Sequence, residues 1–221
     1  MIRPILIAGI IAAAAMLGIS GWAWGQVPAG AQIPIHWGPG GEPNGYASKE
    51  VGLLLLPLLS LGVAALLAFV PGIDPRRTNI LRSQPAYRAI AYAALLLMLV
   101  LHLAAVLTAT GRTVDMARVA SIGVGLLFVI MGNYLGKTRS SWFFGIRTPW
   151  TLSSERSWAL THRLGGYLFA AFGALMVAIG AVNPAWLAWA LIPGLILVVG
   201  MPVAYSYLVW RDDPHRQSME S

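Results

Sequence analysis

Apolar residues dominate six long runs of the chain, which shorter polar connections separate. The runs are Ile5–Trp24, Val51–Val70, Ala89–Leu107, Val119–Leu135, Leu164–Val182 and Trp186–Val209. Each is close to the roughly 20 residues that an α-helix needs to cross a bilayer. Lipid offers the backbone no hydrogen-bond partner, so each run is predicted to be helical. The pattern therefore predicts an all-α, polytopic membrane protein with a six-helix transmembrane bundle.

Composition supports this class of protein. Of the 221 residues, 57% are hydrophobic and 10% are charged, whereas soluble domains carry about a quarter charged residues. The net charge of +7 would suggest nucleic acid in a soluble domain. Here the basic residues cluster at the ends of apolar runs, which indicates topology and lipid contact instead, and no direct nucleic-acid partner is expected. The chain has no cysteine, which excludes disulfides and thiol catalysis.

The first run has two interpretations. Arg3 followed by an alanine-rich core is typical of a signal peptide. However, the run is full length, and it ends in Gly21–Trp24 rather than in a small-residue cleavage site. An uncleaved transmembrane helix is the favoured interpretation.

The basic residues predict the orientation. Twelve lie on one side of the predicted membrane and three on the other, which is the bias of the positive-inside rule. Both termini, the 71–88 loop and the 136–163 loop are expected to be cytoplasmic. The 25–50 loop, the 108–118 loop and the Asn183–Ala185 turn are expected to face outward.

The same boundaries predict four parts of the chain. They are an N-terminal two-helix module at 1–70 with its extracytoplasmic loop at 25–50, a basic loop and third helix at 71–118, a three-helix module at 119–210, and a polar tail at 211–221. Small residues recur every four positions at Gly166, Ala170, Ala174 and Ala178. This spacing predicts a face that another helix approaches closely.

The stretch 132–166 differs from its apolar surroundings. It holds five basic residues against one acid, Glu155, and three tryptophans. We predict an interfacial element here, with 142–144 dipping into the interface and 147–150 extended, because Pro149 disfavours helix before it. Ser153 or Ser154 is expected to cap a helix that merges into the fifth span. Arg147 beside Trp150 could make a cation–π contact or grip a phosphate or carboxylate; the alternative is an element that only anchors to anionic lipid.

The 26–50 loop is rich in glycine and proline. Residues 33–37 are predicted to be extended, and 38–41 and 43–45 to be turns. The groups available for binding there are His36, Trp37, Glu42, Asn44 and Lys49. One histidine with one glutamate is too few ligands for zinc, so neither a metal nor another cofactor is expected.

Ionisable residues inside a membrane usually indicate transport or proton relay. No Asp or Glu falls within a predicted span, which disfavours a cation-coupled transporter. His102 is the exception. It is either a proton-sensitive or ligand-binding group or, as we favour, a neutral imidazole that donates a hydrogen bond to a neighbouring helix.

The fourth to sixth predicted helices with their loops, about the last 90 residues of the chain, resemble the SdpI family of bacterial membrane proteins, which is named for a toxin-immunity protein. The resemblance rests on Gly132-Asn133-Tyr134, Lys137, Gly145–Leu152, Trp158 and Thr161-His162-Arg163. Residues 33–37, 41–46 and Lys49 are similar to an uncharacterised module that often precedes this family. The family usually has Pro-Asn where this chain has Ser140-Ser141. The resemblance implies a six-helix protein of the bacterial cytoplasmic membrane. By analogy with the founding member of the family, the resemblance also implies protection against a secreted killing peptide and signalling through a repressor that is held at the membrane.

We therefore expect a non-enzymatic immunity or signalling protein in contact with membrane lipid. A peptide toxin is the expected outer partner, and a repressor or other protein the cytoplasmic one. A small transporter or lipid-handling permease is the alternative, and an intramembrane enzyme acting on lipid or cell-wall precursors is a third hypothesis. The candidate binding residues of the cytoplasmic loop are Asn133, Lys137, Arg147, Thr148, Pro149, Trp150, Thr151, Trp158, Thr161, His162 and Arg163.

Overall fold

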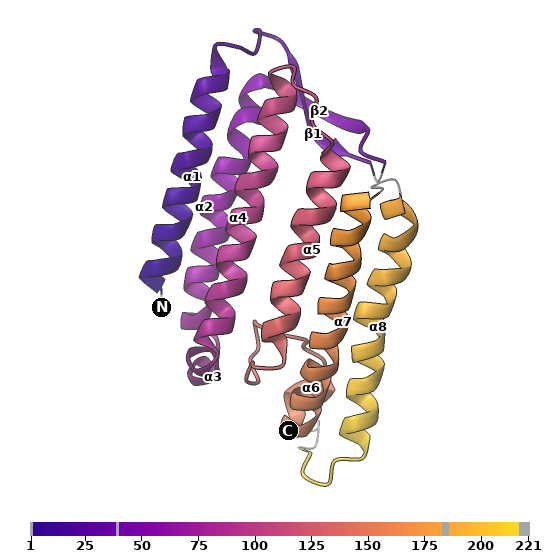
Figure 1. The fold of residues 1–221 in the computed structure, drawn as a ribbon. Helices are drawn as coiled ribbons and strands as arrows, with labels where there is room; N and C mark the ends of the chain where they lie inside the picture. The colour runs from indigo at the N-terminus through magenta and orange to yellow at the C-terminus, as the bar shows by residue number, and fades with distance from the viewer. Residues whose placement is uncertain (1, 39, 183–185, 217–221) are drawn as a thin grey trace.

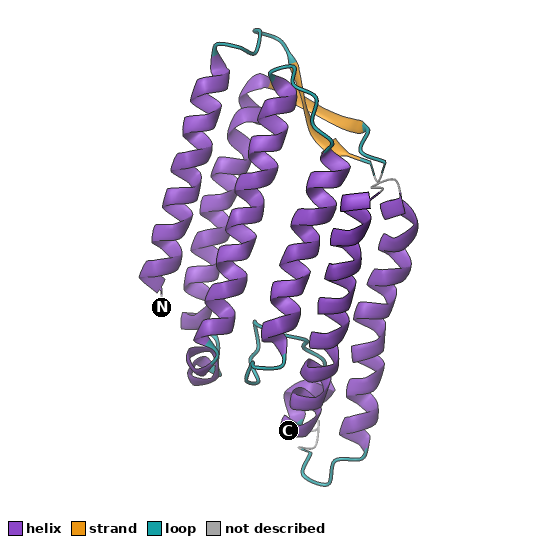
Figure 2. Ribbon diagram, in the orientation of Figure 1, coloured by secondary structure: helices purple, strands orange, loops and turns teal. Residues whose placement is uncertain are grey.

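A computed structural model describes residues 2–38, 40–182 and 186–216. Its elements in chain order are α1 (Ile2–Trp24), β1 (Gln32–Trp37), β2 (Pro43–Ser48), α2 (Lys49–Ile73), α3 (Arg77–Arg82), α4 (Gln84–Ala109), α5 (Met116–Leu135), α6 (Pro149–Ser153), α7 (Glu155–Val182) and α8 (Leu187–Arg211). Within the described ranges, six helices are long and apolar enough to cross a membrane. They stand side by side as one bundle (Figures 1 and 2). The predicted all-α, multi-pass fold is confirmed.

The two ends of the bundle differ in structure. One end carries the start of α1, the end of α8, α3, α6 and the loop between α5 and α6 (Figure 1). We call it the basic end, because twelve of the fifteen Lys and Arg residues lie on this side in the sequence. The opposite end carries the antiparallel β1–β2 sheet, and we call it the hairpin end.

The helices form two groups. Helices α1, α2 and α4 pack together, and α7 packs against both α5 and α8, while α4 and α5 join the groups. The α5–α7 contact is the most extensive, because glycines bring the two backbones together. A Cβ added at Gly132 would lie 2.4 Å from the Ala170 amide nitrogen, and one added at Gly173 would lie 2.5 Å from the Gly125 carbonyl oxygen.

The small-residue face of α7 was only partly predicted. Gly166 and Ala170 meet α5 as expected. Ala174 and Ala178 are exposed, and Gly173 and Gly180 make the contact instead. Spacings of three and four residues alternate along one face of a helix, so a strict repeat of four drifts off it.

The polar connections also differ in part from expectation. Ser154 caps α7 by accepting a hydrogen bond from the Ser157 amide at 2.9 Å, and the helix that begins at Glu155 merges into the fifth span as predicted. Thr148 is extended, but Pro149 and Trp150 open the short helix α6 rather than continuing as extended chain. Proline suits the first turn of a helix, where its missing N–H has no intrahelical role.

At the hairpin end, residues 33–37 are extended as predicted. The predicted turn at 43–45 is wrong, since these residues form the start of β2. The chain reverses before it, where the Gly38 amide donates to the Glu42 carbonyl at 2.9 Å and Gly41 has φ +88°. The predicted Asn183–Ala185 turn and residues 217–221 of the polar tail lie outside the described residues.

Candidate functional site at the basic end

The carboxylate of Asp74, just after α2, holds the loop that follows α5. It is 4% exposed. Its Oδ2 accepts hydrogen bonds from the Ser141 hydroxyl at 2.7 Å and from the Trp142 and Phe143 amides at 3.0 and 3.1 Å. Its Oδ1 accepts from the Arg76 amide at 2.6 Å. Asp74 therefore fixes a loop that lies 67 to 69 residues away in the sequence and belongs to the other helix group.

Arg76 extends this attachment toward α6. Its guanidinium donates to the Ser140 hydroxyl and, at 2.8 Å, to the Leu152 carbonyl. The Asn79 side chain donates to the Ser140 carbonyl at 2.9 Å. Both ends of segment 138–153 are thus tied to the connection between α2 and α4.

His162 orders the turn at Gly145. Its Nδ1 lies 2.8 Å from the Trp158 carbonyl, which can only accept, so Nδ1 carries the proton. Its Nε2 then accepts from the Ile146 amide at 2.8 Å. The Trp158 ring stacks on the imidazole with centroids 3.9 Å apart, and its Nε1 donates to the Thr138 carbonyl at 3.1 Å. Both ring nitrogens of His162 are therefore engaged: Nδ1 fixes the ring on its own helix, α7, and Nε2 holds the loop.

Gly145 is the position at which this turn tolerates only glycine. Its φ is +115°, and an added Cβ would lie 2.5 Å from His162 Nε2 and 2.9 Å from the Trp158 ring. A side chain would be both strained and obstructed there. The ring stack and the glycine therefore form one packed unit.

Thr148 and Thr151 cap the N-terminus of α6, and Thr148 also attaches α6 to α8. The Thr148 side chain accepts from the Thr151 amide at 3.1 Å, and the Thr151 side chain accepts from the Thr148 amide at 2.9 Å. This is a reciprocal capping box. The Thr148 hydroxyl also lies 3.0 Å from that of Ser206 in α8, and the Ser157 hydroxyl donates to the Ser206 carbonyl at 2.8 Å.

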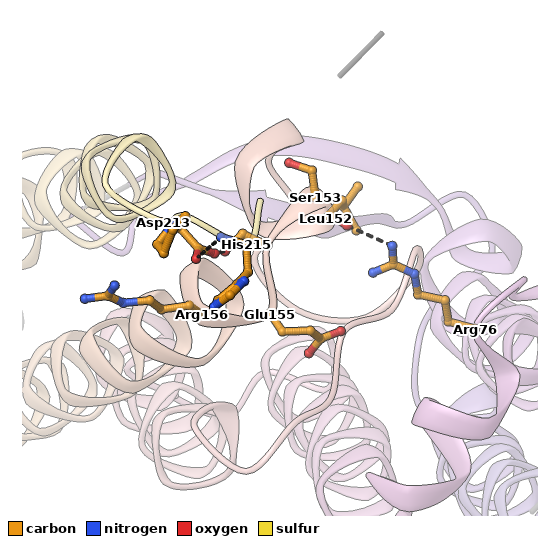
Figure 3. A pocket seen from close by; sticks show the side chains of 9 residues that line it. Arg76, Leu152, Ser153, Glu155, Arg156, Asp213 and His215 are labelled. Atoms are coloured by element: carbon orange, nitrogen blue, oxygen red, sulfur yellow. Dashed lines mark hydrogen bonds between the residues drawn. The ribbon is translucent and has the colours of Figure 1, made fainter. Parts of the chain in front are cut away.

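The chain after α8 folds back onto the start of α7. The Ser154 hydroxyl donates to the Asp213 carboxylate. This hydrogen bond, followed by one from the His215 amide, lowers the pKa of Asp213 from its ordinary value of 3.8. A cavity of about 550 Å³ lies beside this contact. Figure 3 shows Arg76, Glu155, Arg156, Asp213 and His215 around it, so its lining mixes both signs of charge.

We call the hydrogen-bonded side chains of these paragraphs the polar network: Asp74, Arg76, Asn79, Ser140, Ser141, Thr148, Thr151, Ser154, Ser157, Trp158, His162, Ser206 and Asp213. Some of the candidate residues predicted from the sequence are buried in the protein, and others lie at its surface. Thr148, Thr151, Trp158, Thr161 and His162 are buried. Thr161 is fully buried, and its hydroxyl has no hydrogen-bond partner among the described residues.

The other candidates lie at the surface. Asn133, Lys137, Arg147, Pro149 and Arg163 are exposed. Arg147 donates to the Trp142 carbonyl at 3.0 Å. The half-buried Trp150 packs edge-on against Tyr207, with the ring centroids 5.2 Å apart. The cation–π contacts between described residues do not include an Arg147–Trp150 pair. The Asn133 amide makes no hydrogen bond with the described residues.

The sequence interpretation missed eight members of the network: Asp74, Arg76, Asn79, Ser140, Ser141, Ser157, Ser206 and Asp213. A signal did exist for Asp74, which is the sole acid among four arginines in residues 71–88. Ser206 had no comparable signal, because a serine within an apolar helix usually bonds to its own backbone.

At the hairpin end, the candidate groups serve mainly the local structure. Lys49 is 9% exposed, donates to the Val27 carbonyl at 2.7 Å and lies over the Trp24 ring. His36 is hydrogen-bonded to Asn44 across the hairpin. Glu42 is exposed, and Trp37 is half-buried. No group of three or more potential metal-ligating side chains occurs within residues 2–38, 40–182 and 186–216.

His102 of α4 is fully buried and faces α1. The Ser20 hydroxyl donates to the Leu53 carbonyl at 2.7 Å, so its oxygen is free to accept from His102 Nε2 at 3.0 Å. The Met16 carbonyl lies 3.1 Å from the same nitrogen. The imidazole therefore donates from Nε2 into α1, which agrees with the favoured interpretation.

The fold and the polar network define a class: a multi-pass membrane protein whose two helix groups are joined at one end by buried polar side chains. A family model described as the SdpI/YfhL protein family matches residues 137–206, which include most of that network. A second model, described as a domain of unknown function (DUF1648), matches residues 11–61. The resemblance to the SdpI family is thereby confirmed: the SdpI/YfhL model matches residues 137–206, and the DUF1648 model matches the part of the chain before them.

One curated protein is similar to most of the chain. It is the Immunity protein SdpI of Bacillus subtilis (strain 168), which is 24% identical over 180 residues, covering 80% of this chain and 82% of that protein. No solved structure matches the chain.

Proposed function

We propose that this protein is a non-enzymatic membrane protein that gives its host immunity to a secreted peptide toxin. In this proposal the basic end faces the cytoplasm, where it presents a fixed surface to a partner protein such as a repressor. The hairpin end faces outward, toward the toxin. The similarity to the Immunity protein SdpI along 80% of the chain supports the immunity role.

The observation that carries the proposal is how the polar groups of the basic end are used. Asp74 and His162 are buried, and both bond to loop amides. A general base needs a free lone pair directed at substrate, whereas these groups are committed to holding segment 138–153 in one conformation. Such an element suits a binding surface better than a catalytic centre or a loose lipid anchor.

The surface that this element presents is basic. Lys137, Arg139, Arg147 and Arg163 are exposed on or beside the fixed loop. Fixed cations bind an acidic partner with less loss of side-chain and loop entropy than a mobile loop would. We therefore assign the cytoplasmic partner to an acidic protein surface, with anionic lipid as the competing ligand.

The packing around His102 argues against the permease alternative. A transport path needs polar groups accessible near the middle of the membrane. His102 is fully buried and bonded to α1, so it contributes no open polar path.

The test of immunity uses the native host. The gene is deleted, and the cells are exposed to spent medium from a wild-type culture. We expect killing of the deletion strain and rescue by the wild-type gene. Rescue should fail with Asp74→Ala, which releases the loop, and should weaken with Arg147→Ala at equal expression. A deletion strain that survives as well as its parent, in medium shown to kill an unrelated strain, would contradict the proposal.

A further inference from the structure

A cavity of about 670 Å³ lies between the two helix groups at the hairpin end. Its walls come from both groups, with Leu56 and Leu101 on one side and Ala120 of α5 on the other. The roof consists of residues 34–38 of the hairpin together with Asn44. The volume falls within the roughly 300–1,000 Å³ of small-ligand sites.

The hairpin rests on both sides of this cavity. Ile33 of β1 is buried and fits against Gly52 of α2, where an added Cβ would lie 2.6 Å from the Ile33 Cβ. Gly41 contacts α5, where its added Cβ would lie 3.1 Å from the Ala117 Cβ. The sheet therefore covers a space that the helices leave unfilled.

The charge of the lining limits the occupant. None of the residues lining the cavity in the described part of the chain is an Asp, Glu, Lys or Arg. Lys49 lies next to the hairpin, but it is engaged with Val27 and Trp24. A phosphate headgroup would need cations or several free donors, so an anionic lipid does not fit this cavity.

The roof offers polar groups that an acyl chain would not use. Five consecutive residues of the hairpin border the cavity, and β1 pairs with β2 alone. A strand with one partner has backbone N–H and C=O groups on its other edge that can bind an added chain. A peptide inside a membrane needs such partners for its own backbone. Apolar walls, an uncharged lining and a strand at the roof together suit a peptide.

We propose that this cavity binds an uncharged apolar segment of a membrane-inserting peptide, with its backbone against β1 and its side chains among Leu56, Leu101 and Ala120. That the natural peptide is a toxin rests on the proposed function; the chemistry of the site does not. His36 and Asn44, which bond to each other at the roof, make up the polar rim.

The experiment uses full-length protein in nanodiscs of phosphatidylethanolamine and phosphatidylglycerol. The probe is a synthetic leucine–alanine peptide that carries a photoreactive diazirine leucine. After illumination, mass spectrometry should locate labels on the cavity walls. Ala120→Phe and Leu101→Trp fill the space and should each reduce labelling about tenfold. Ala174→Phe, at an exposed position of α7, is the matched control and should label as wild type does.

Two further probes test the chemistry. A matched peptide with a central lysine should label the cavity about tenfold less, because burying an unpaired charge is costly. A diazirine-bearing phosphatidylcholine tests occupancy by lipid. The inference is overturned if folded Ala120→Phe and Leu101→Trp label as wild type does, if the lysine peptide labels equally, or if the peptide cannot displace lipid label from the cavity walls.

These results are independent of the survival assay. If the peptide labels the cavity specifically but deletion of the gene causes no sensitivity, the immunity role is contradicted and the peptide site is supported. Sensitivity of the deletion strain without specific labelling would remove the site and leave the immunity role.

Discussion

The two ends of the bundle join the same two groups of helices by different means. At the basic end, Asp74 and Arg76 of one group hydrogen-bond to segment 138–153 of the other. At the hairpin end, a two-stranded sheet covers an apolar cavity between the groups. Directional bonds specify one arrangement, whereas apolar contacts allow repacking at low cost. The basic end is therefore built for rigidity, and the hairpin end can accommodate a ligand.

Substitution of two positive-φ glycines, one near each end of the bundle, tests this difference most strongly. Gly145→Ala should lower the free energy of unfolding by roughly 2–5 kcal/mol, since it adds both backbone strain and a clash with His162 and Trp158. Gly30→Ala, near the hairpin, has φ +81° but no atom within 4 Å of the added Cβ, and should cost only about 1 kcal/mol. Thermal unfolding in detergent measures both. Equal losses would show that the turn at Gly145 is not tightly packed.

Removing one carboxylate at each end is the next comparison. Asp74→Ala leaves the Trp142 amide without an acceptor and the Phe143 amide with the Ser141 hydroxyl alone, and should cost roughly 2–4 kcal/mol. Asp115→Ala removes the N-cap of α5 and an exposed ion pair with Arg118, and should cost about 1 kcal/mol. Hydrogen exchange should accelerate at the two loop amides in the Asp74 variant alone. Unchanged exchange at these two amides would show that groups other than Asp74 hold the loop.

Adding volume at two positions of α5 compares a packed contact with a cavity. Gly132→Ala should cost roughly 1–3 kcal/mol, because its Cβ would lie 2.4 Å from the Ala170 backbone nitrogen. Ala120→Phe adds more atoms, but it points into the cavity and should change stability by about 1 kcal/mol or less. Unfolding temperatures of the two variants decide between these expectations. A larger loss in the phenylalanine variant would mean that the space near Ala120 is not available.

The smallest expected effect is the pH dependence of the tail contact. The Ser154 hydroxyl, the His215 amide and nearby Arg156 lower the pKa of Asp213 from 3.8. Because the folded pKa is the lower one, this contribution to stability is complete above the ordinary value and is lost as pH falls below it. Hydrogen exchange at the Ser157 and His215 amides, corrected for intrinsic rates, should be unchanged from pH 8 to 5 and should rise in stronger acid.

A control variant isolates that carboxylate. Asp213→Asn keeps an oxygen acceptor but does not titrate, so its exchange at the same amides should lack the acid transition. If the variant and the wild type share that transition, another group controls the docking of the tail.

Local signals in the sequence predicted several features of the basic end correctly. Ser154 was one of two candidate caps, and the chain's own preference for helix after Glu155 needed no tertiary information. The mutual caps of Thr148 and Thr151 are equally local, although we expected extended chain at Pro149 and Trp150. The contacts of Asp74 with Ser141 and of Thr148 with Ser206 join residues more than 50 positions apart. No periodicity specifies such pairs.

The candidate residues show the same division. The sequence selected His162 and Trp158 by resemblance and Arg147 by charge, but it could not tell which face of the chain each side chain would take. In the packed structure His162 and Trp158 are buried and support the loop, whereas Arg147 lies at the surface. The hairpin-end cavity lies between helices α2, α4, α5 and α8. A space between several helices leaves no pattern in the sequence of any one of them.

The sequence by itself determined the six helices and the grouping of basic residues at their ends, because each helix must satisfy its own backbone in lipid and each charge must avoid the hydrocarbon. Only the tertiary structure decided that Asp74 holds the loop after α5, and that the hairpin covers a space between the two groups. These features depend on which surfaces meet once the helices are packed. The two partners of each contact belong to different elements, and they meet only in the assembled bundle.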